Sequence, residues 1–75
     1  MSKIKYNRIK TVLTEADKKN SDLAKYMKVH VITVSNWCTN TNQPSIQDLF
    51  KIAKFVNKDV RQLLVSTRPN DKSEN

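Results

Sequence analysis

The sequence of 75 residues contains no glycine. Without glycine, the chain cannot form the loops that wrap backbone amides around phosphates in nucleotide-binding folds. The usual two-residue hairpin turns are disfavoured for the same reason. Asparagine is the next residue that adopts a left-handed backbone at tolerable cost. We therefore expect helices joined by turns that contain Asn.

Cysteine and long apolar runs are also scarce. Cys38 is the single thiol, so no disulfide can form within the chain, and we expect a reducing compartment, the cytoplasm. The longest apolar run, residues 63–65, is far shorter than the ~20 residues that cross a bilayer. The charged start, "MSKIKYNRIK", lacks the apolar segment of a signal peptide. We expect neither a membrane span nor a secreted protein.

Positive charge is plentiful but unevenly placed. The chain has 14 Lys and Arg against 7 Asp and Glu, a formal net charge of +7, which favours a polyanionic partner such as nucleic acid. Yet no charged residue, His30 aside, occurs over residues 29–47, where Thr, Ser, Asn and Gln surround one Trp. The side chains of residues 29–47 are therefore suited to hydrogen bonds rather than to ionic contacts.

Apolar side chains recur at helical spacing in the first half of the chain. Polar side chains near residue 20 can cap a second helix over residues 21–28, and a third is predicted from about residue 31 to 39. Trp37 lies three residues after Val34, so core packing explains it better than base stacking. The first helix is predicted by four residues at i, i+3, i+4 and i+7: Ile9, Val12, Leu13 and Ala16.

Two further helices are predicted after the loop "CTNTNQPS", in which Pro44 interrupts helical structure. Ser45 can cap the fourth helix, and Asn57 can end it in a left-handed conformation. Asp59 and Gln62 resemble a capping box that opens a fifth helix. The expected core residues are Ile46, Leu49, Phe50 and Ala53 in the fourth helix, and Val60, Leu63 and Leu64 in the fifth.

Five short helices, with "DLAKYMKVHVITVSNW" across the second and third, resemble the helix-turn-helix of the phage Cro and cI repressor type, the XRE family. "NWCTNTNQPS" is similar to a subgroup of small bacterial regulators of this family. The resemblance implies an all-α, five-helix, lambda-repressor-like DNA-binding domain over residues 1–65, with the helix-turn-helix unit at about 20–39. Residues 66–75 are polar and are expected to form a disordered tail. The matching positions are Leu23, Ala24, Met27, Val29, Val34, Trp37, Pro44, Ser45, Ile52, Ala53, Val60, Leu63 and Leu64.

The sequence departs from the family pattern at three positions. Lys28 replaces the usual turn Gly. If the backbone stays left-handed, Lys costs roughly 1 kcal/mol of stability relative to Gly. Asn40 replaces the Gly that often ends the third helix and can adopt the same conformation. Cys38 replaces an acidic residue, and a structural thiol explains it better than a redox sensor or metal ligand. His30 precedes the third helix, where a phosphate contact and a solvated cap both remain open.

The resemblance implies that the third helix enters the major groove of double-stranded DNA. Its base contacts would be Val31, Ile32, Thr33 and Asn36. Because Asn pairs with adenine and apolar groups pack on thymine methyls, we expect an A·T-leaning half-site. Contacts to the DNA backbone are expected from Asn20, Ser21, Thr39, Asn40, Asn42 and Ser45. Electrostatic attraction is expected from Lys19, Lys25 and Lys28.

The expected function is a sequence-specific transcription regulator, a repressor or controller, that acts as a homodimer on a near-palindromic operator. Candidates for the two-fold interface are Phe55, Leu64 and Val65, although a core position is an equal alternative for Leu64. A second hypothesis is a protein-interaction module of the same fold, antitoxin-like or adaptor-like, with an unidentified protein partner. With one His, one Cys and no paired carboxylates, we expect no catalytic residue, metal site or cofactor.

Overall fold

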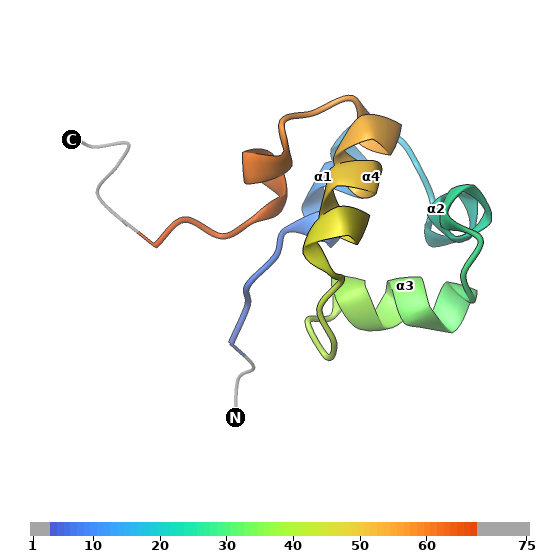
Figure 1. The fold of residues 1–75 in the computed structure, drawn as a ribbon, viewed down its shortest axis with the longest axis horizontal. Coiled ribbons are helices and arrows are strands. Elements are labelled where there is room, and N and C mark those ends of the chain that lie inside the picture. Colours follow the sequence, from blue (N-terminus) through green and yellow to red (C-terminus); the bar gives the residue numbers. More distant parts are fainter. Residues whose placement is uncertain (1–3, 68–75) are drawn as a thin grey trace.

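The computed structural model of the chain describes residues 4–67. The elements are α1 (Ile9–Glu15), α2 (Asn20–Met27), α3 (Val31–Cys38), α4 (Ile46–Val56) and the 3-10 turn η1 (Val60–Leu63). In Figure 1, α3 lies below α1 and α4, and α2 lies at the far end of α3 from the chain termini. The predicted all-α fold and the positions of its four α-helices are confirmed.

The fifth helix was predicted as an α-helix and is instead one 3-10 turn. The predicted capping box is present, because Asp59 Oδ1 accepts from Arg61 N at 2.9 Å and Gln62 Oε1 accepts from Asp59 N at 3.3 Å. The chain then becomes extended at Leu64, which forms an antiparallel bridge with Asn7. Pairing with the segment before α1 therefore replaces a second helical turn.

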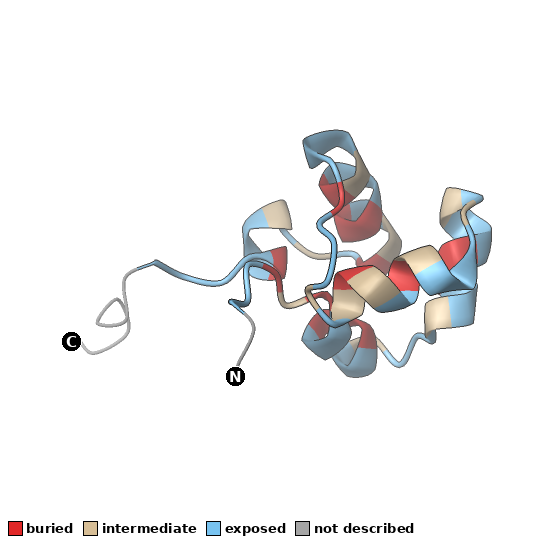
Figure 2. Cartoon of the chain, turned by 90° about the horizontal axis from the view of Figure 1, so that it is seen from below, coloured by how far each residue is buried: buried red, intermediate tan, exposed pale blue. Residues whose placement is uncertain are grey.

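One hydrophobic core lies between the helices, and Figure 2 shows its buried positions on their inner faces. Trp37 is 5% exposed, which confirms its predicted core position. The prediction for α4 was wrong at Ile46 and Phe50, which are 69% and 60% exposed. The stripe that starts at Leu49 has the same helical spacing and is the one buried. The core consists of Ile9, Val12, Leu13, Leu23, Ala24, Val34, Trp37, Leu49, Ile52, Ala53, Val56 and Leu63.

Asn7 is a buried polar residue, only 3% exposed, in the segment before α1. Its Nδ2 donates to the Trp37 carbonyl at 3.0 Å and to Gln43 Oε1 at 2.7 Å. Its Oδ1 accepts from the Ile9 amide at 3.0 Å. The side chain is thus satisfied by three segments, and it joins the start of α1 to the end of α3.

Asn40 completes this attachment from the loop after α3. Its Oδ1 accepts from the amides of Tyr6 at 2.8 Å and Asn7 at 3.0 Å, and from Gln43 Nε2 at 3.1 Å. Its Nδ2 donates to the Asn7 carbonyl at 3.2 Å. This contact between two asparagines was not predicted from the sequence. The contact of Asn7 with Ile9 is an Asx turn, which an Asn two residues before the first apolar position could have indicated.

Each of the four α-helices is followed by a residue with a left-handed backbone. These residues are Asp17, Lys28, Asn40 and Asn57, with φ between 58° and 61°. After α2, the Val29 amide donates to the Ala24 carbonyl at 3.0 Å, the long hydrogen bond of a Schellman motif. The left-handed conformations predicted for Asn40 and Asn57 are confirmed, whereas Asp17 was not predicted.

We expect Asn7→Ala to lower the free energy of unfolding by about 1–3 kcal/mol. The change leaves the Ile9 amide without its acceptor, at about 1–3 kcal/mol when it stays buried, and removes one of the two donors to the Trp37 carbonyl, which the Asn40 amide still contacts at 3.1 Å. Urea unfolding followed by Trp37 fluorescence measures the difference. Asn42→Ala is the matched control, since the Asn42 side chain is exposed and makes no hydrogen bond in residues 4–67. The control should change stability by less than about 0.5 kcal/mol.

We expect Lys28→Gly to raise the free energy of unfolding by about 0.5–1 kcal/mol, because glycine adopts the left-handed backbone without a Cβ clash. The same change at Lys25, inside α2, should lower it by about 1 kcal/mol, because glycine is a poor helix former. Both variants lose one positive charge, so the comparison isolates the backbone. Thermal unfolding followed by circular dichroism measures both, and changes of the same sign would contradict the assignment.

Candidate nucleic-acid interface

Small and β-branched residues hold α2 and α3 close together. Ala24 of α2 is 6% exposed and Val34 of α3 is fully buried. Val29, between the helices, is half-buried and packs against the core. Because Ala24 presents a single methyl group, the two helices can approach closely, and a larger side chain there would force them apart. The angle of α3 is therefore set by the core.

The outward side of α3 begins at its first turn. Val31 and Ile32 are 42% and 60% exposed, although both are large apolar residues. Thr33 and Asn36 are half-buried on the same helix. The predicted cap is present, because His30 Nδ1 accepts from the Ile32 amide at 3.5 Å. The four predicted base contacts thus lie on the first two turns of α3.

Three polar side chains of α3 have unused hydrogen-bonding capacity. Thr33, Ser35 and Asn36 make no side-chain hydrogen bond within residues 4–67. The main chain of Asn36 is engaged instead, since its carbonyl accepts from the amides of Thr41 at 2.9 Å and Asn42 at 3.2 Å. The loop therefore folds back on the helix end while the Asn36 amide group stays available. Such an amide can both donate and accept at an adenine edge.

The start of α2 presents the predicted backbone contacts Asn20 and Ser21. The helix begins one residue earlier than predicted, and the Asp22 carboxylate closes its start by accepting from the Lys19 amide at 3.1 Å. Asn20 Oδ1 accepts from Cys38 Sγ at 3.5 Å, which links the beginning of α2 to the end of α3. The Asn20 Nδ2 group makes no hydrogen bond within the described chain and can donate outward.

The loop after α3 brings the other predicted backbone contacts next to the helix. Thr39 Oγ1 donates to the Asn36 carbonyl at 3.3 Å and lies 2.8 Å from Thr41 Oγ1. Ser45 Oγ accepts from the Asp48 amide at 3.0 Å, which confirms the predicted cap of α4. The Asn40 side chain is different, because its amide group binds the segment before α1. Asn40 thus positions the loop, and its side chain is not free for the predicted contact with the DNA backbone.

Comparison with known proteins agrees with this geometry. A family model described as helix-turn-helix matches residues 9–63. The chain belongs to the XRE-type helix-turn-helix family. A crystal structure of a candidate DNA-binding protein from Bacteroides fragilis has 44% sequence identity and a TM-score of 0.80, and covers 83% of this chain and 100% of its own. A transcriptional regulator from Listeria innocua shares the fold at 22% identity and a TM-score of 0.69, over 95% of this chain and 71% of its own. No curated protein matches the sequence.

The helix-turn-helix unit keeps its positive charges unpaired. Lys19, Lys25 and Lys28 are exposed. The ion pairs within residues 4–67 are Lys58–Glu15 at 3.6 Å and Arg61–Asp59 at 3.0 Å, and neither involves the three lysines. Asp22 is the one carboxylate of residues 19–39. The unit therefore presents a net positive surface beside a neutral α3.

Cys38 is a half-buried, neutral thiol in this helix-turn-helix. Burial raises the pKa of the Cys38 thiol, and the nearby Lys10 ammonium lowers it by a smaller amount. The thiol is therefore a donor at neutral pH, in keeping with its contact to Asn20. No group of three or more His, Cys, Asp or Glu side chains that could hold a metal ion occurs in the described part of the chain. None of the helices described is long and apolar enough to cross a membrane.

The three residues predicted for a dimer interface have different surroundings. The Phe55 ring is half-buried, with its centroid 4.8 Å from that of Tyr26 and 5.2 Å from Lys18 Nζ. Leu64 and Val65 are 41% and 40% exposed after η1. The alternative core position for Leu64 is wrong, because Leu63 occupies the core at that turn.

Proposed function

We propose that the chain is a sequence-specific, double-stranded DNA-binding transcription regulator that acts as a homodimer on a near-palindromic operator. The observation that carries the proposal is the outward side of α3. It combines exposed Val31 and Ile32 with the unpaired side chains of Thr33 and Asn36, on a helix whose angle the core fixes. Membership of the XRE-type family and the likeness to the Bacteroides fragilis protein support it.

Sequence preference would come from the first two turns of α3. Asn36 would donate and accept at the major-groove edge of adenine, while Ile32 and Val31 would pack on thymine methyls. Thr33 offers both a methyl group and a hydroxyl. Each good pairing contributes about 1–3 kcal/mol of discrimination, so an A·T-leaning half-site follows.

Neutral donors around α3 would hold the DNA phosphates. Asn20 and Ser21 lie at the start of α2, and Thr39, Asn42 and Ser45 lie in the loop and at the start of α4. Because these groups are short and uncharged, their contacts depend on close geometry and fix the docking angle of the helix. The lysines would add affinity for DNA of any sequence without affecting the choice of bases.

Selection of random duplexes at about 150 mM salt, near physiological ionic strength, should enrich an A·T-rich inverted repeat. Combined Thr33→Ala and Asn36→Ala should abolish the preference but leave salt-dependent binding to unrelated DNA. Combined Lys19→Gln and Lys25→Gln should weaken binding to all sequences similarly and keep the preference. Fluorescence anisotropy with the selected and a scrambled duplex measures both effects. If the two pairs of variants exchange their effects, the assignment is wrong; if no motif is enriched, a protein-interaction module replaces the proposal.

The homodimer would use an exposed apolar edge beside η1. The Val65 amide donates to the Tyr6 carbonyl at 3.0 Å, so these two residues lie side by side. Tyr6 is 57% exposed, and Leu64 and Val65 add two more partly exposed apolar side chains. Phe55, the third residue predicted for the interface, would contribute at its margin, since Tyr26 and Lys18 already contact its ring.

We expect Val65→Glu to convert a dimer to a monomer, because it would place a charge in the proposed apolar contact and two-fold symmetry would repeat that charge in both copies. Ile46→Glu is the control, since Ile46 is 69% exposed and begins α4, which contributes none of Tyr6, Leu64 and Val65. Sedimentation velocity measures the oligomeric state of both. Dissociation by the Ile46 change, or a monomeric native protein at concentrations that bind DNA, would refute this interface.

A further inference from the structure

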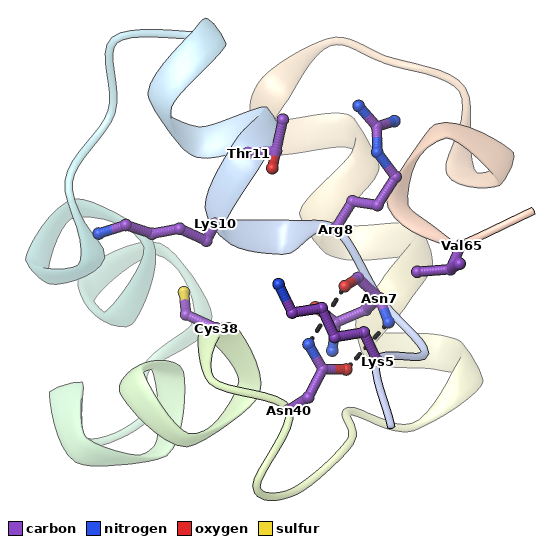
Figure 3. A pocket seen from close by; sticks show the side chains of 8 residues that line it. All are labelled: Lys5, Asn7, Arg8, Lys10, Thr11, Cys38, Asn40 and Val65. Atoms are coloured by element: carbon purple, nitrogen blue, oxygen red, sulfur yellow. Dashed lines mark hydrogen bonds between the residues drawn. The ribbon is translucent and has the colours of Figure 1, made fainter. Parts of the chain in front are cut away.

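A pocket of about 310 Å³ lies between the segment before α1, the first turn of α1 and the end of α3. In Figure 3, Lys5 extends from the segment before α1 toward Cys38 and Lys10 extends from α1 above Cys38, so that the two ammonium groups lie on opposite sides of the Cys38 sulfur in this view. The polar lining consists of Lys5, Asn7, Arg8, Lys10, Thr11, Cys38 and Asn40, and Val65 completes the wall. Nothing described above assigns it a ligand.

The pocket lining contains three cations and no carboxylate. The ion pairs of the described chain involve Lys58 and Arg61, so none of the three pocket cations is neutralised within residues 4–67. Arg8 NH1 donates to the Gln62 carbonyl at 2.8 Å, which holds the guanidinium in place. The side chains of Lys5 and Lys10 make no hydrogen bond in this part of the chain. Because no carboxylate neutralises these three cations, a bound anion or solvent ions must balance their charge.

The neutral polar groups of the pocket are mostly engaged within the protein. Asn40 binds the segment before α1, and the Cys38 thiol donates to Asn20. The Thr11 hydroxyl makes no hydrogen bond within residues 4–67 and can donate into the pocket. Unpaired ammonium groups with a hydroxyl, and no competing carboxylate, match an anion whose oxygens accept several hydrogen bonds.

The position of the pocket points to phosphate as that anion. Cys38, in its wall, contacts Asn20 at the start of α2, and Asn40 belongs to the loop after α3. Both segments are proposed above to hold DNA phosphates; the pocket includes Asn40 of the loop and is connected to the start of α2 through Cys38. We propose that the pocket binds a phosphate group through Lys5, Lys10 and Thr11. The choice of phosphate rests on the proposed function. The group belongs either to the DNA backbone or to a free phosphorylated compound.

The first arm of the test measures phosphate binding directly. Inorganic phosphate is titrated into the 15N-labelled protein at constant ionic strength, with chloride as the reference anion. We expect saturable shifts of the amides of residues 5–11 and of Cys38. Combined Lys5→Gln and Lys10→Gln should weaken this binding at least tenfold. Combined Lys51→Gln and Lys54→Gln is the control, because it removes the same charge from exposed positions of α4.

The second arm separates the two sources with a mixed-sequence duplex of about 20 base pairs. If the phosphate belongs to DNA, the change at Lys5 and Lys10 should reduce the slope of log K against log salt by about 1, the value for one lost phosphate contact. The control should keep the slope. If the slope is unchanged but inorganic phosphate binding is lost, the ligand is a free phosphorylated compound.

Two results would contradict the proposal that the pocket binds phosphate. One is the absence of both the saturable shifts and the change in slope. The other is an equal loss in the pocket variant and the α4 control, since net charge alone would then explain it. The native protein is sufficient for the titration, so a variant that fails to fold leaves the test intact. If phosphate binds to the pocket but no sequence is enriched from random duplexes, the proposed function is wrong and the proposal of a phosphate-binding pocket is still supported.

Discussion

The arrangement of α3 and of the loop after it depends on one contact, in which the Asn40 side chain bonds the main chain of Asn7. Together the two side chains join the segment before α1, the end of α3 and the loop that leads to α4. The Trp37 carbonyl at the end of α3 accepts from the Asn7 side chain and from the Asn40 amide. A buried polar network of this kind stabilises a fold only when every member is paired, and it then permits one geometry. The end of α3 is therefore held by hydrogen bonds, while its middle is held by Val34 and Trp37 in the core.

Periodicity and turn chemistry predicted most of the fold. The absence of glycine indicated left-handed asparagines, and Asn40 and Asn57 adopt that conformation. The buried side of α4 could not be predicted, because the stripes beginning at Ile46 and at Leu49 have the same spacing. Only the neighbouring helices decide which of them is covered. The length of η1 could not be predicted either, because it depends on the bridge between Leu64 and Asn7, which are far apart in the sequence.

The candidate site also has one part that the sequence predicts and one part that it does not. Its α3 residues follow from the family resemblance, since their positions relative to the core pattern are local. The engagement of the Asn40 side chain and the pocket beside α1 depend on contacts between residues 5–11 and 38–40, which no local pattern encodes. Charge also separates along the surface, with lysines around the interface and neutral side chains on α3. In the proposed complex with DNA, long-range attraction and the choice of bases would thus depend on different side chains.

The four left-handed turns have a consequence for the unfolded chain. A residue with a side chain in this conformation costs roughly 1–2 kcal/mol, and somewhat less for Asn and Asp, whose side chains bond locally. Glycine would remove that strain, but glycine also loses the most conformational freedom on folding. A chain without it samples fewer conformations before it folds, so less entropy is lost when its turns close. The stability of these helix ends therefore arises partly in the denatured ensemble, where the number of competing conformations is already small.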